Sequence, residues 1–255
     1  MARVITVTNQ KGGVGKTTTA INLAYYLAKR GARVLIVDFD PQGNASSGLG
    51  IDKTALKATM TDVMMGTAKL ADVMMKTDCC KTLWIAPAVP DLANAEVEMG
   101  ALNNKFVQLK NAIKSVEQDF EYIVIDSPPS LSLLTVNGLI AANYLLLPVQ
   151  TEFYALEGVS QLLESMSLVK KRLNPDLKLI GVLATMFDKR TALSTQVLLE
   201  IQKYFKDKVF TTVIPRNVRL AEAPSHGVPI GIYDRFSKGS KAYKDLAREV
   251  EERAK

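Results

Sequence analysis

The stretch NQKGGVGKTTT, residues 9–19, follows an apolar run and precedes a segment with helical periodicity. Its end, Gly15-Lys16-Thr17, matches a phosphate-binding loop, whose pattern is Gly, four residues, Gly, Lys and then Ser or Thr. The first position differs, because Gln10 stands where the pattern has glycine, and Lys11 adds a second lysine. The order of strand, glycine-rich loop and helix predicts a nucleotide-binding α/β protein with a variant loop.

Each part of this loop has a chemical role in binding a nucleoside triphosphate. Glycines allow the turns that point backbone N–H groups at phosphate oxygens, and the helix that follows adds its positive N-terminal end. The Lys16 ammonium can reach the β- and γ-phosphates, and the Thr17 hydroxyl can ligate Mg²⁺. The backbone groups expected around the phosphates are those of Gly12, Gly13, Val14, Gly15 and Lys16.

Beyond the loop, apolar strands alternate with helical segments to the end of the chain. This pattern predicts one α/β domain over 1–255, with a mostly parallel sheet and helices on both faces. Ligands bind at the carboxyl ends of the strands in such sheets. The expected strands are 3–9, 32–40, 82–88, 122–128, 144–150, 177–187 and 210–215, and the expected helices include 17–31, 105–118, 155–173 and 191–205.

Carboxylates follow two of the apolar runs. VLIVDFDPQGN places Asp38 and Asp40 after the second strand, and YIVIDSPPS places Asp126 after a later one. Because these strand ends meet at the edge that carries the loop, we expect three acids beside the phosphates. One acid can support Mg²⁺, and another can orient or deprotonate an attacking water.

Composition restricts the remaining function classes. Lys and Arg number 32 and Asp and Glu 26, so the net charge is +6, which suits an anionic partner such as nucleic acid or an acidic membrane surface. The chain shows no signal-peptide pattern and no apolar run long enough to span a membrane, so we expect a cytoplasmic location. Cys79 and Cys80 lack the spacing of a zinc or redox motif, and the single histidine, His226, disfavours histidine-rich metal sites.

Two segments have less specific patterns. Methionines recur between residues 60 and 75, which is typical of adaptable core packing, although a partner-binding groove is an alternative. The C-terminal segment 237–255 has a thin apolar stripe of Tyr243, Leu246 and Val250. A membrane-lying helix needs bulky apolar residues opposite a basic face, so this segment is predicted to be a capping helix with a solvated face.

Five stretches together resemble the ParA/Soj family of partition ATPases. They are KGGVGKTT, DFDPQGN, IDSPPS, TEFYALEG and IPRNVRLAEAPSHG, and the resemblance runs from about residue 3 to about residue 235. Relatives with the same loop variant include MinD and the nitrogenase iron protein. The resemblance implies an ATP-sandwich homodimer in which Lys11 reaches the phosphates bound by the other subunit, with Gly12 at the crowded boundary.

The same resemblance assigns roles to further residues. It implies that Asp40 positions the attacking water, that Asp126 supports Mg²⁺ and that Thr18 contacts the α-phosphate. Glu152 is expected near the dimer interface, without an assigned contact. The residues that the resemblance associates with adenine are Pro215 and Asn217, and those that it associates with DNA on the dimer surface are Arg190 and Arg219.

The implied function is ATP-dependent segregation of a chromosome or plasmid. The ATP dimer is expected to bind double-stranded DNA without sequence preference, to associate with the nucleoid, and to leave it after hydrolysis stimulated by a ParB-type partner. The first strand begins near Arg3, so we expect no N-terminal DNA-binding domain. The thin apolar stripe of the C-terminal segment leads us to expect no membrane partner. Alternatives are a MinD-like membrane-associated ATPase, an iron–sulfur reductase, which the adjacent cysteines disfavour, and a ParA-like ATPase that positions a protein cluster or organelle.

Overall fold

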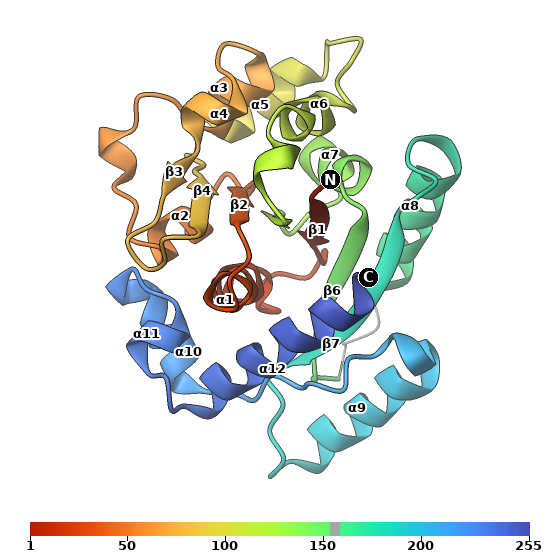
Figure 1. Cartoon of the computed structure of the whole chain (residues 1–255). Helices are drawn as coiled ribbons and strands as arrows, with labels where there is room; N and C mark the ends of the chain where they lie inside the picture. Colours follow the sequence, from red (N-terminus) through yellow and green to blue (C-terminus); the bar gives the residue numbers. More distant parts are fainter. Residues whose placement is uncertain (154–158) are drawn as a thin grey trace.

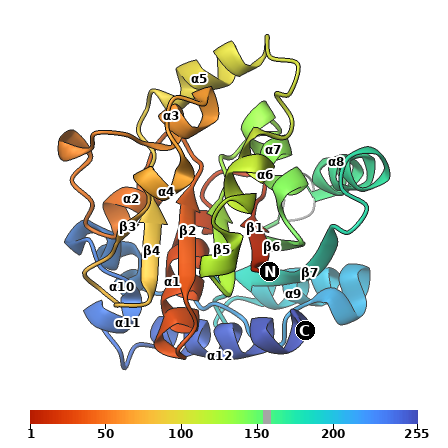
Figure 2. The ribbon, with the colours of Figure 1, turned by 45° about the horizontal axis from the view of Figure 1, so that its top comes forward.

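A mostly parallel sheet forms the centre of the molecule. The computed structural model describes residues 1–153 and 159–255, and within these ranges seven strands form one sheet. Every neighbouring pair is parallel except the short antiparallel pair at one edge. Figure 2 shows the strands side by side. Their order is β3 (Met75–Lys76), β4 (Leu83–Ala86), β2 (Val34–Asp38), β5 (Tyr122–Asp126), β1 (Arg3–Val7), β6 (Tyr144–Gln150) and β7 (Lys178–Thr185).

Helices cover both faces of this sheet, as the alternating pattern predicted (Figure 1). On one face, the core contains Ile5 and Ile36 and is covered by α1 (Lys16–Lys29), α2 (Asn44–Gly48), α10 (Val218–Glu222), α11 (Ile230–Tyr233) and α12 (Lys238–Arg253). On the other face, it contains Val4 and Leu35 and is covered by α3 (Met60–Met65), α4 (Leu70–Val73), α5 (Leu92–Met99), α6 (Gln108–Lys114), α7 (Leu133–Ala141) and α8 (Val159–Arg172).

The remaining elements close the edges. The helix α9 (Ala192–Phe205) packs with α8 over the β6–β7 end of the sheet. Short 3₁₀ turns are η1 (Lys53–Ala55), η2 (Glu117–Asp119), η3 (Lys206–Lys208) and η4 (Ala223–His226). No helix in the described ranges is long and apolar enough to cross a membrane.

Burial explains why the central strands were recognisable in the sequence. All five residues of β2 and of β5 are buried, because helices lie on both sides of them. A strand of this kind has no solvent face and is therefore apolar at successive positions rather than at alternate ones. Each fully buried aliphatic side chain contributes about 1.5–3 kcal/mol of transfer free energy, so these runs hold the sheet together.

The C-terminal helix packs against the helix that follows the phosphate-binding loop. Tyr243, Leu246 and Val250 of α12 are buried in the core on the α1 side, as their spacing predicted. The Tyr243 hydroxyl lies 3.1 Å from the Thr19 hydroxyl of α1. This helix is thus a capping element of the core.

The predicted strand at 210–215 is wrong. Isolated bridges join Val209 to Val182 and Pro215 to Phe187, but no strand forms between them. The backbone N–H groups of Thr211 and Thr212 donate to the Glu249 carboxylate of α12, at 2.8 and 3.0 Å. Since these donors are turned towards α12, the segment only follows the edge of β7 and does not extend the sheet.

Candidate nucleotide-binding site

Hydrogen bonds to the neighbouring strands fix the position of the loop between β1 and α1. The Asn9 side chain donates to the Pro148 carbonyl at 2.7 Å and accepts the Lys11 N–H at 3.0 Å. The Thr185 hydroxyl donates to the Val14 carbonyl at 2.9 Å. Gly13 and Gly15 have φ angles of 75° and 87°, which favour glycine. The loop is therefore fixed at the carboxyl ends of β6 and β7.

Lys16 begins α1, and its side chain turns back over the loop. Its ammonium donates to the Lys11 carbonyl at 3.1 Å, and the residue is 7% exposed. Burial lowers the pKa of Lys16, while the Asp126 and Asp40 carboxylates act in the opposite direction. Among the described side chains, none caps the N-terminus of α1 at Gly15. The first N–H groups of this helix are thus available to an anion.

Two of the predicted acids face each other on neighbouring strands. Asp38 and Asp126 are register partners at the ends of β2 and β5, and both are fully buried. One Asp38 oxygen accepts from the Ser46 N–H and hydroxyl, at 2.8 and 2.6 Å. Burial raises the pKa of Asp38 to about 6, against the effect of the Ser46 hydrogen bonds. Asp38 is therefore bound to α2, a contact that sequence reasoning did not predict.

Asp126 has no such partner. Neither carboxylate oxygen has a hydrogen bond of good geometry to any described residue. Burial, and then the Asp38 carboxylate, raise the pKa of Asp126 well above its usual range, whereas the Thr17 hydroxyl and the Lys16 ammonium lower it. A buried, unpaired carboxylate beside a threonine hydroxyl has the oxygen donors that Mg²⁺ prefers. The residues at this position therefore fit a magnesium ion.

The third acid, Asp40, lies in the turn between β2 and α2. One carboxylate oxygen accepts the Gln42 N–H at 3.0 Å, and the Asp40 carbonyl accepts the Gly43 N–H at 2.8 Å. The residue is 6% exposed, and its charge acts on Lys16 and on Asp126. The structure thus brings all three acids to the edge that carries the loop.

A pocket of about 350 Å³ opens beside the loop. It brings the predicted adenine segment, Pro215 and Asn217, together with Gly15 and Thr18 of the phosphate-binding segment. Asn217 also caps α10, because its side-chain oxygen accepts the Arg219 N–H at 2.9 Å. Sequence reasoning did not assign Thr185, Met186 and Tyr243 to this pocket, and it gave no role to Arg216 of the IPRN stretch, although all four line it.

Comparisons with known proteins agree with this geometry. The AAA domain family model matches residues 2–179. The sporulation initiation inhibitor protein Soj of Bacillus subtilis (strain 168) is 53% identical over 250 residues, 98% of each chain. The chromosome partitioning protein ParA of Myxococcus xanthus (strain DK1622) is 49% identical over 253 residues, 99% of this chain and 89% of the relative. This chain belongs to the ParA/Soj family.

A solved structure extends the likeness to three dimensions. Cobyrinic acid a,c-diamide synthase from Mycobacterium smegmatis, crystallised with an ATP analogue and magnesium, superposes with a TM-score of 0.85 at 38% identity. The match covers 97% of this chain and 93% of the other. The pocket wall at residues 214–221 lies beyond the matched family model, but within the length shared with these relatives.

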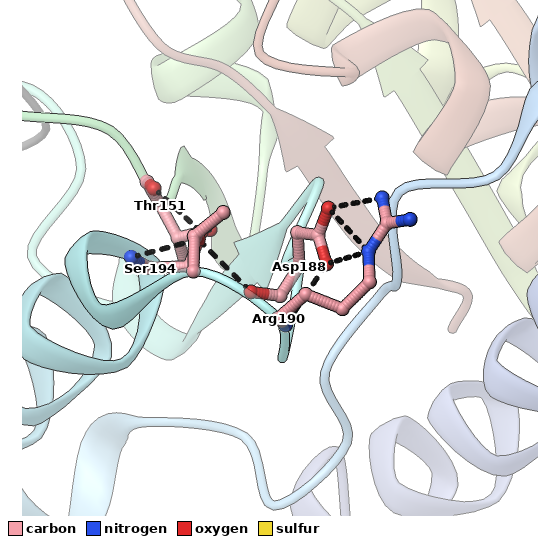
Figure 3. A network of polar contacts seen from close by, with 5 residues as sticks. Thr151, Asp188, Arg190 and Ser194 are labelled. Atoms are coloured by element: carbon pink, nitrogen blue, oxygen red, sulfur yellow. Dashed lines mark hydrogen bonds and ion pairs between the residues drawn. The ribbon is translucent and has the colours of Figure 1, made fainter.

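The ParA/Soj resemblance singled out two arginines, and both are engaged by acids. Arg190 follows β7 and is 82% exposed, and its guanidinium forms several hydrogen bonds to Asp188, the shortest at 2.7 Å (Figure 3). Arg219 of α10 lies 2.9 Å from Glu222 and 3.8 Å from Asp234. The guanidinium of Arg190 holds the pKa of Asp188 well below its usual range. Each cation is therefore accompanied by a carboxylate, which the sequence pattern did not indicate.

The loop residues that the ParA/Soj resemblance assigned to a dimer boundary are accessible. Lys11 is half-buried and Gly12 is exposed. An ideal Cβ built on Gly12 has no described heavy atom within 4 Å. Within the described part of this chain, no neighbouring atom therefore requires glycine at position 12.

The other predicted sites have mixed outcomes. Met60 and Met64 are fully buried, as the core interpretation of the methionines predicted, whereas Met75 is exposed. Glu152 is exposed and accepts a hydrogen bond from the Gln150 amide at 2.6 Å. The rest of TEFYALEG, at 154–158, lies outside the described residues.

Proposed function

We propose that the chain is the ATPase of a chromosome-partition system and that ATP controls its affinity for DNA. Membership of the ParA/Soj family supports the partition role, and the chain hydrolyses ATP with Mg²⁺. The observation that carries the proposal is the meeting of three groups at one sheet edge. These are the phosphate-binding loop, the unpaired Asp126 carboxylate and the pocket beside Pro215 and Asn217.

The loop and its neighbours hold the triphosphate. Backbone N–H groups of the loop and of the first turn of α1 contact the phosphate oxygens, and Lys16 exchanges the Lys11 carbonyl for the β- and γ-phosphates. Thr18 lines the same pocket as Pro215 and Asn217, which supports a contact of Thr18 with the α-phosphate and of Pro215 and Asn217 with adenine. Thr17 and Asp126 hold Mg²⁺, which neutralises charge on the β- and γ-phosphates.

Hydrolysis requires an oriented water and stabilisation of the transition-state charge. Asp40 accepts a hydrogen bond from the attacking water, since one of its oxygens is already fixed by the Gln42 N–H. Lys11 from a second copy of the chain supplies a cation in trans. In the GTPases that use an arginine finger, a cation supplied in this manner raises kcat by a factor of about 10³–10⁵. Hydrolysis then depends on dimerisation.

DNA binding follows from the same dimer. Arg190 and Arg219 of both copies form a cationic surface that contacts phosphates, and this binding has no sequence preference. The ATP-bound dimer therefore associates with the nucleoid. A ParB-type protein stimulates hydrolysis, and the monomers leave the DNA.

The Asp188–Arg190 pair provides a sharp test. Arg190→Ala removes a cation from the DNA-binding surface, so DNA binding with ATP weakens and the slope of log K against log salt falls by about 0.9 for each phosphate that is no longer neutralised. Asp188→Asn removes the competing carboxylate and strengthens DNA binding. Duplex DNA is titrated at several salt concentrations with ATP and with ADP, and Asp207→Asn serves as the matched control on a distant exposed acid.

The comparison of Asp188→Asn with Asp207→Asn separates the proposal from general charge effects, because each variant removes one negative charge. A larger gain in affinity from Asp188→Asn than from Asp207→Asn, and a loss from Arg190→Ala, both seen with ATP and not with ADP, support the arginine contact. If Asp188→Asn and Asp207→Asn raise affinity equally, only net charge matters and Arg190 has no contact with DNA. Equal DNA binding with ATP and with ADP contradicts nucleotide control altogether.

A further inference from the structure

A lysine further along the chain holds the turn that carries Asp40. Residues 40–43, DPQG, form this turn, which is closed by a hydrogen bond from the Gly43 N–H to the Asp40 carbonyl at 2.8 Å. Proline at the second position and glycine at the fourth are favoured in such turns. The Lys53 ammonium donates to the Gln42 carbonyl and to the Gly43 carbonyl, each at 3.1 Å. The turn is therefore fixed by Lys53 as well as by its own backbone.

The end of α2 brings Lys53 back to this turn. The Ile51 N–H donates to the Ser46 carbonyl and the Gly50 N–H to the Ser47 carbonyl, each at 3.0 Å. Gly50 has a φ of 75°, and these two bonds with a left-handed glycine form a common reversal at a helix end. The chain then enters η1, whose first residue is Lys53. The backbone thus sets the position of the lysine.

Lys53 and Asp40 contact opposite ends of one peptide group. The C=O and N–H of a trans peptide point in opposite directions. The carbonyl between Gln42 and Gly43 accepts from Lys53, and the N–H of the same peptide donates to the Asp40 carbonyl. The preceding N–H, that of Gln42, donates to one Asp40 carboxylate oxygen at 3.0 Å. Rotation of this peptide would break its two hydrogen bonds and displace the donor that fixes the carboxylate.

The charge of Lys53 is directed at these carbonyls. The residue is half-buried, and none of the ion pairs among the described residues includes it. Hydrogen bonds from a charged donor are stronger than those between neutral groups, which offsets the conformational entropy that a lysine side chain loses when it is held. The contact to the turn is therefore the interaction that a neutral side chain at position 53 would lose.

We propose that Lys53 is a positioning residue for ATP hydrolysis. It holds the turn so that the Asp40 carboxylate keeps one oxygen directed at the attacking water, which rests on the role of Asp40 given under the proposed function. In this role Lys53 makes no contact with the nucleotide, so its loss slows the chemical step and leaves ATP affinity unchanged. Because a small misplacement of a reacting group costs as much as about 100-fold in rate, we expect Lys53→Met to slow hydrolysis by about 10- to 100-fold.

Single-turnover hydrolysis by the full chain with ATP and Mg²⁺ measures this change. Binding of a labelled non-hydrolysable analogue, dimerisation with that analogue and thermal melting are measured on the same samples. Lys53→Met removes the ammonium and keeps an unbranched side chain, whereas Lys53→Arg keeps a cation and should retain more of the rate. Lys57→Met, on an exposed lysine of the same segment, is the matched control for the loss of one positive charge and should hydrolyse ATP at the parental rate.

Combination with Asp40→Ala separates positioning from a general effect on the fold. If Lys53 acts through Asp40, Lys53→Met slows the parent protein but not the Asp40→Ala protein, so the two effects are not additive. Additive effects overturn the proposal. So does a slower rate that is explained by weaker ATP binding or weaker dimerisation, and so does an arginine variant no faster than the methionine variant.

The same samples distinguish this proposal from the role of Asp40 itself. Parental hydrolysis by Lys53→Met together with slow hydrolysis by Asp40→Ala overturns only the role of Lys53. Parental hydrolysis by Asp40→Ala refutes water positioning by Asp40, and the role of Lys53 with it.

Discussion

Replacement of Gly12 by valine distinguishes a constraint within the chain from one imposed by a second copy. Gly12 is exposed, its φ is not positive, and its added Cβ meets no described atom within 4 Å. The variant should therefore change the free energy of unfolding by no more than about 0.5 kcal/mol. ATP binding by the monomer should persist, because the backbone N–H groups remain.

The expected effect on the dimer is much larger. If Gly12 faces the second copy, each added side chain overpacks the boundary at about 1–3 kcal/mol. A two-fold dimer contains two such positions, so the total is about 2–6 kcal/mol. Association should then weaken by roughly 30-fold to more than 10,000-fold.

Analytical ultracentrifugation with a non-hydrolysable ATP analogue and Mg²⁺ measures this change. Gly13→Val is the matched control, because its φ of 75° makes a side chain strained within the monomer by about 1–2 kcal/mol. That control should lower the melting temperature, by roughly 2–8 °C, and disturb ATP binding. A Gly12→Val protein that dimerises like the parent refutes the sandwich arrangement of this loop.

Three further variants test other parts of the site and fold. Lys16→Ala should abolish binding of a labelled ATP analogue, because it removes the buried cation beside the loop; affinity within a few-fold of the parent contradicts the role. Asp40→Ala should bind ATP and dimerise but hydrolyse slowly, and single-turnover hydrolysis at the parental rate would exclude Asp40 from water positioning. Glu249→Ala should destabilise the fold by about 1–2 kcal/mol, since it leaves the Thr211 and Thr212 N–H groups without their acceptor. Calorimetric melting measures this loss, and Glu252→Ala on the exposed face of α12 should have little effect; equal shifts would argue against the Glu249 contacts.

The central strands were predictable from sequence because burial on both faces leaves a continuous apolar run that ends in a turn signal. The β2 and β5 runs each end in an aspartate, and the structure places these aspartates opposite each other. The segment 210–215 has the same apolar character but fails to form a strand. The Thr211 and Thr212 N–H groups donate to Glu249, which is distant in sequence. A local sequence pattern cannot predict a contact of this kind.

Some features of the candidate site were predictable from the sequence and others were not. The loop lysines and strand-end acids carry recognisable spacing, so they were identified in advance. The Ser46 contact to Asp38 depends on where α2 packs, and no spacing rule predicts it. The Arg190–Asp188 ion pair spans only two residues, but the sequence does not show whether such neighbours turn towards each other or towards solvent.

The position of β1 in the sheet affects how the chain is synthesised. β1 leaves the ribosome well before its two partners in the sheet, because β5 and β6 begin more than a hundred residues later in the chain. Until they emerge, an apolar strand has no edge to pair with, and such delayed pairing is slow and prone to aggregation. ATP cannot stabilise the chain before β5 and β6 emerge, because part of the wall of its pocket comes from residues 214–221 and from Tyr243. Folding of the nascent chain therefore precedes ATP binding, and chaperones that shield apolar segments have most of the translation time in which to act.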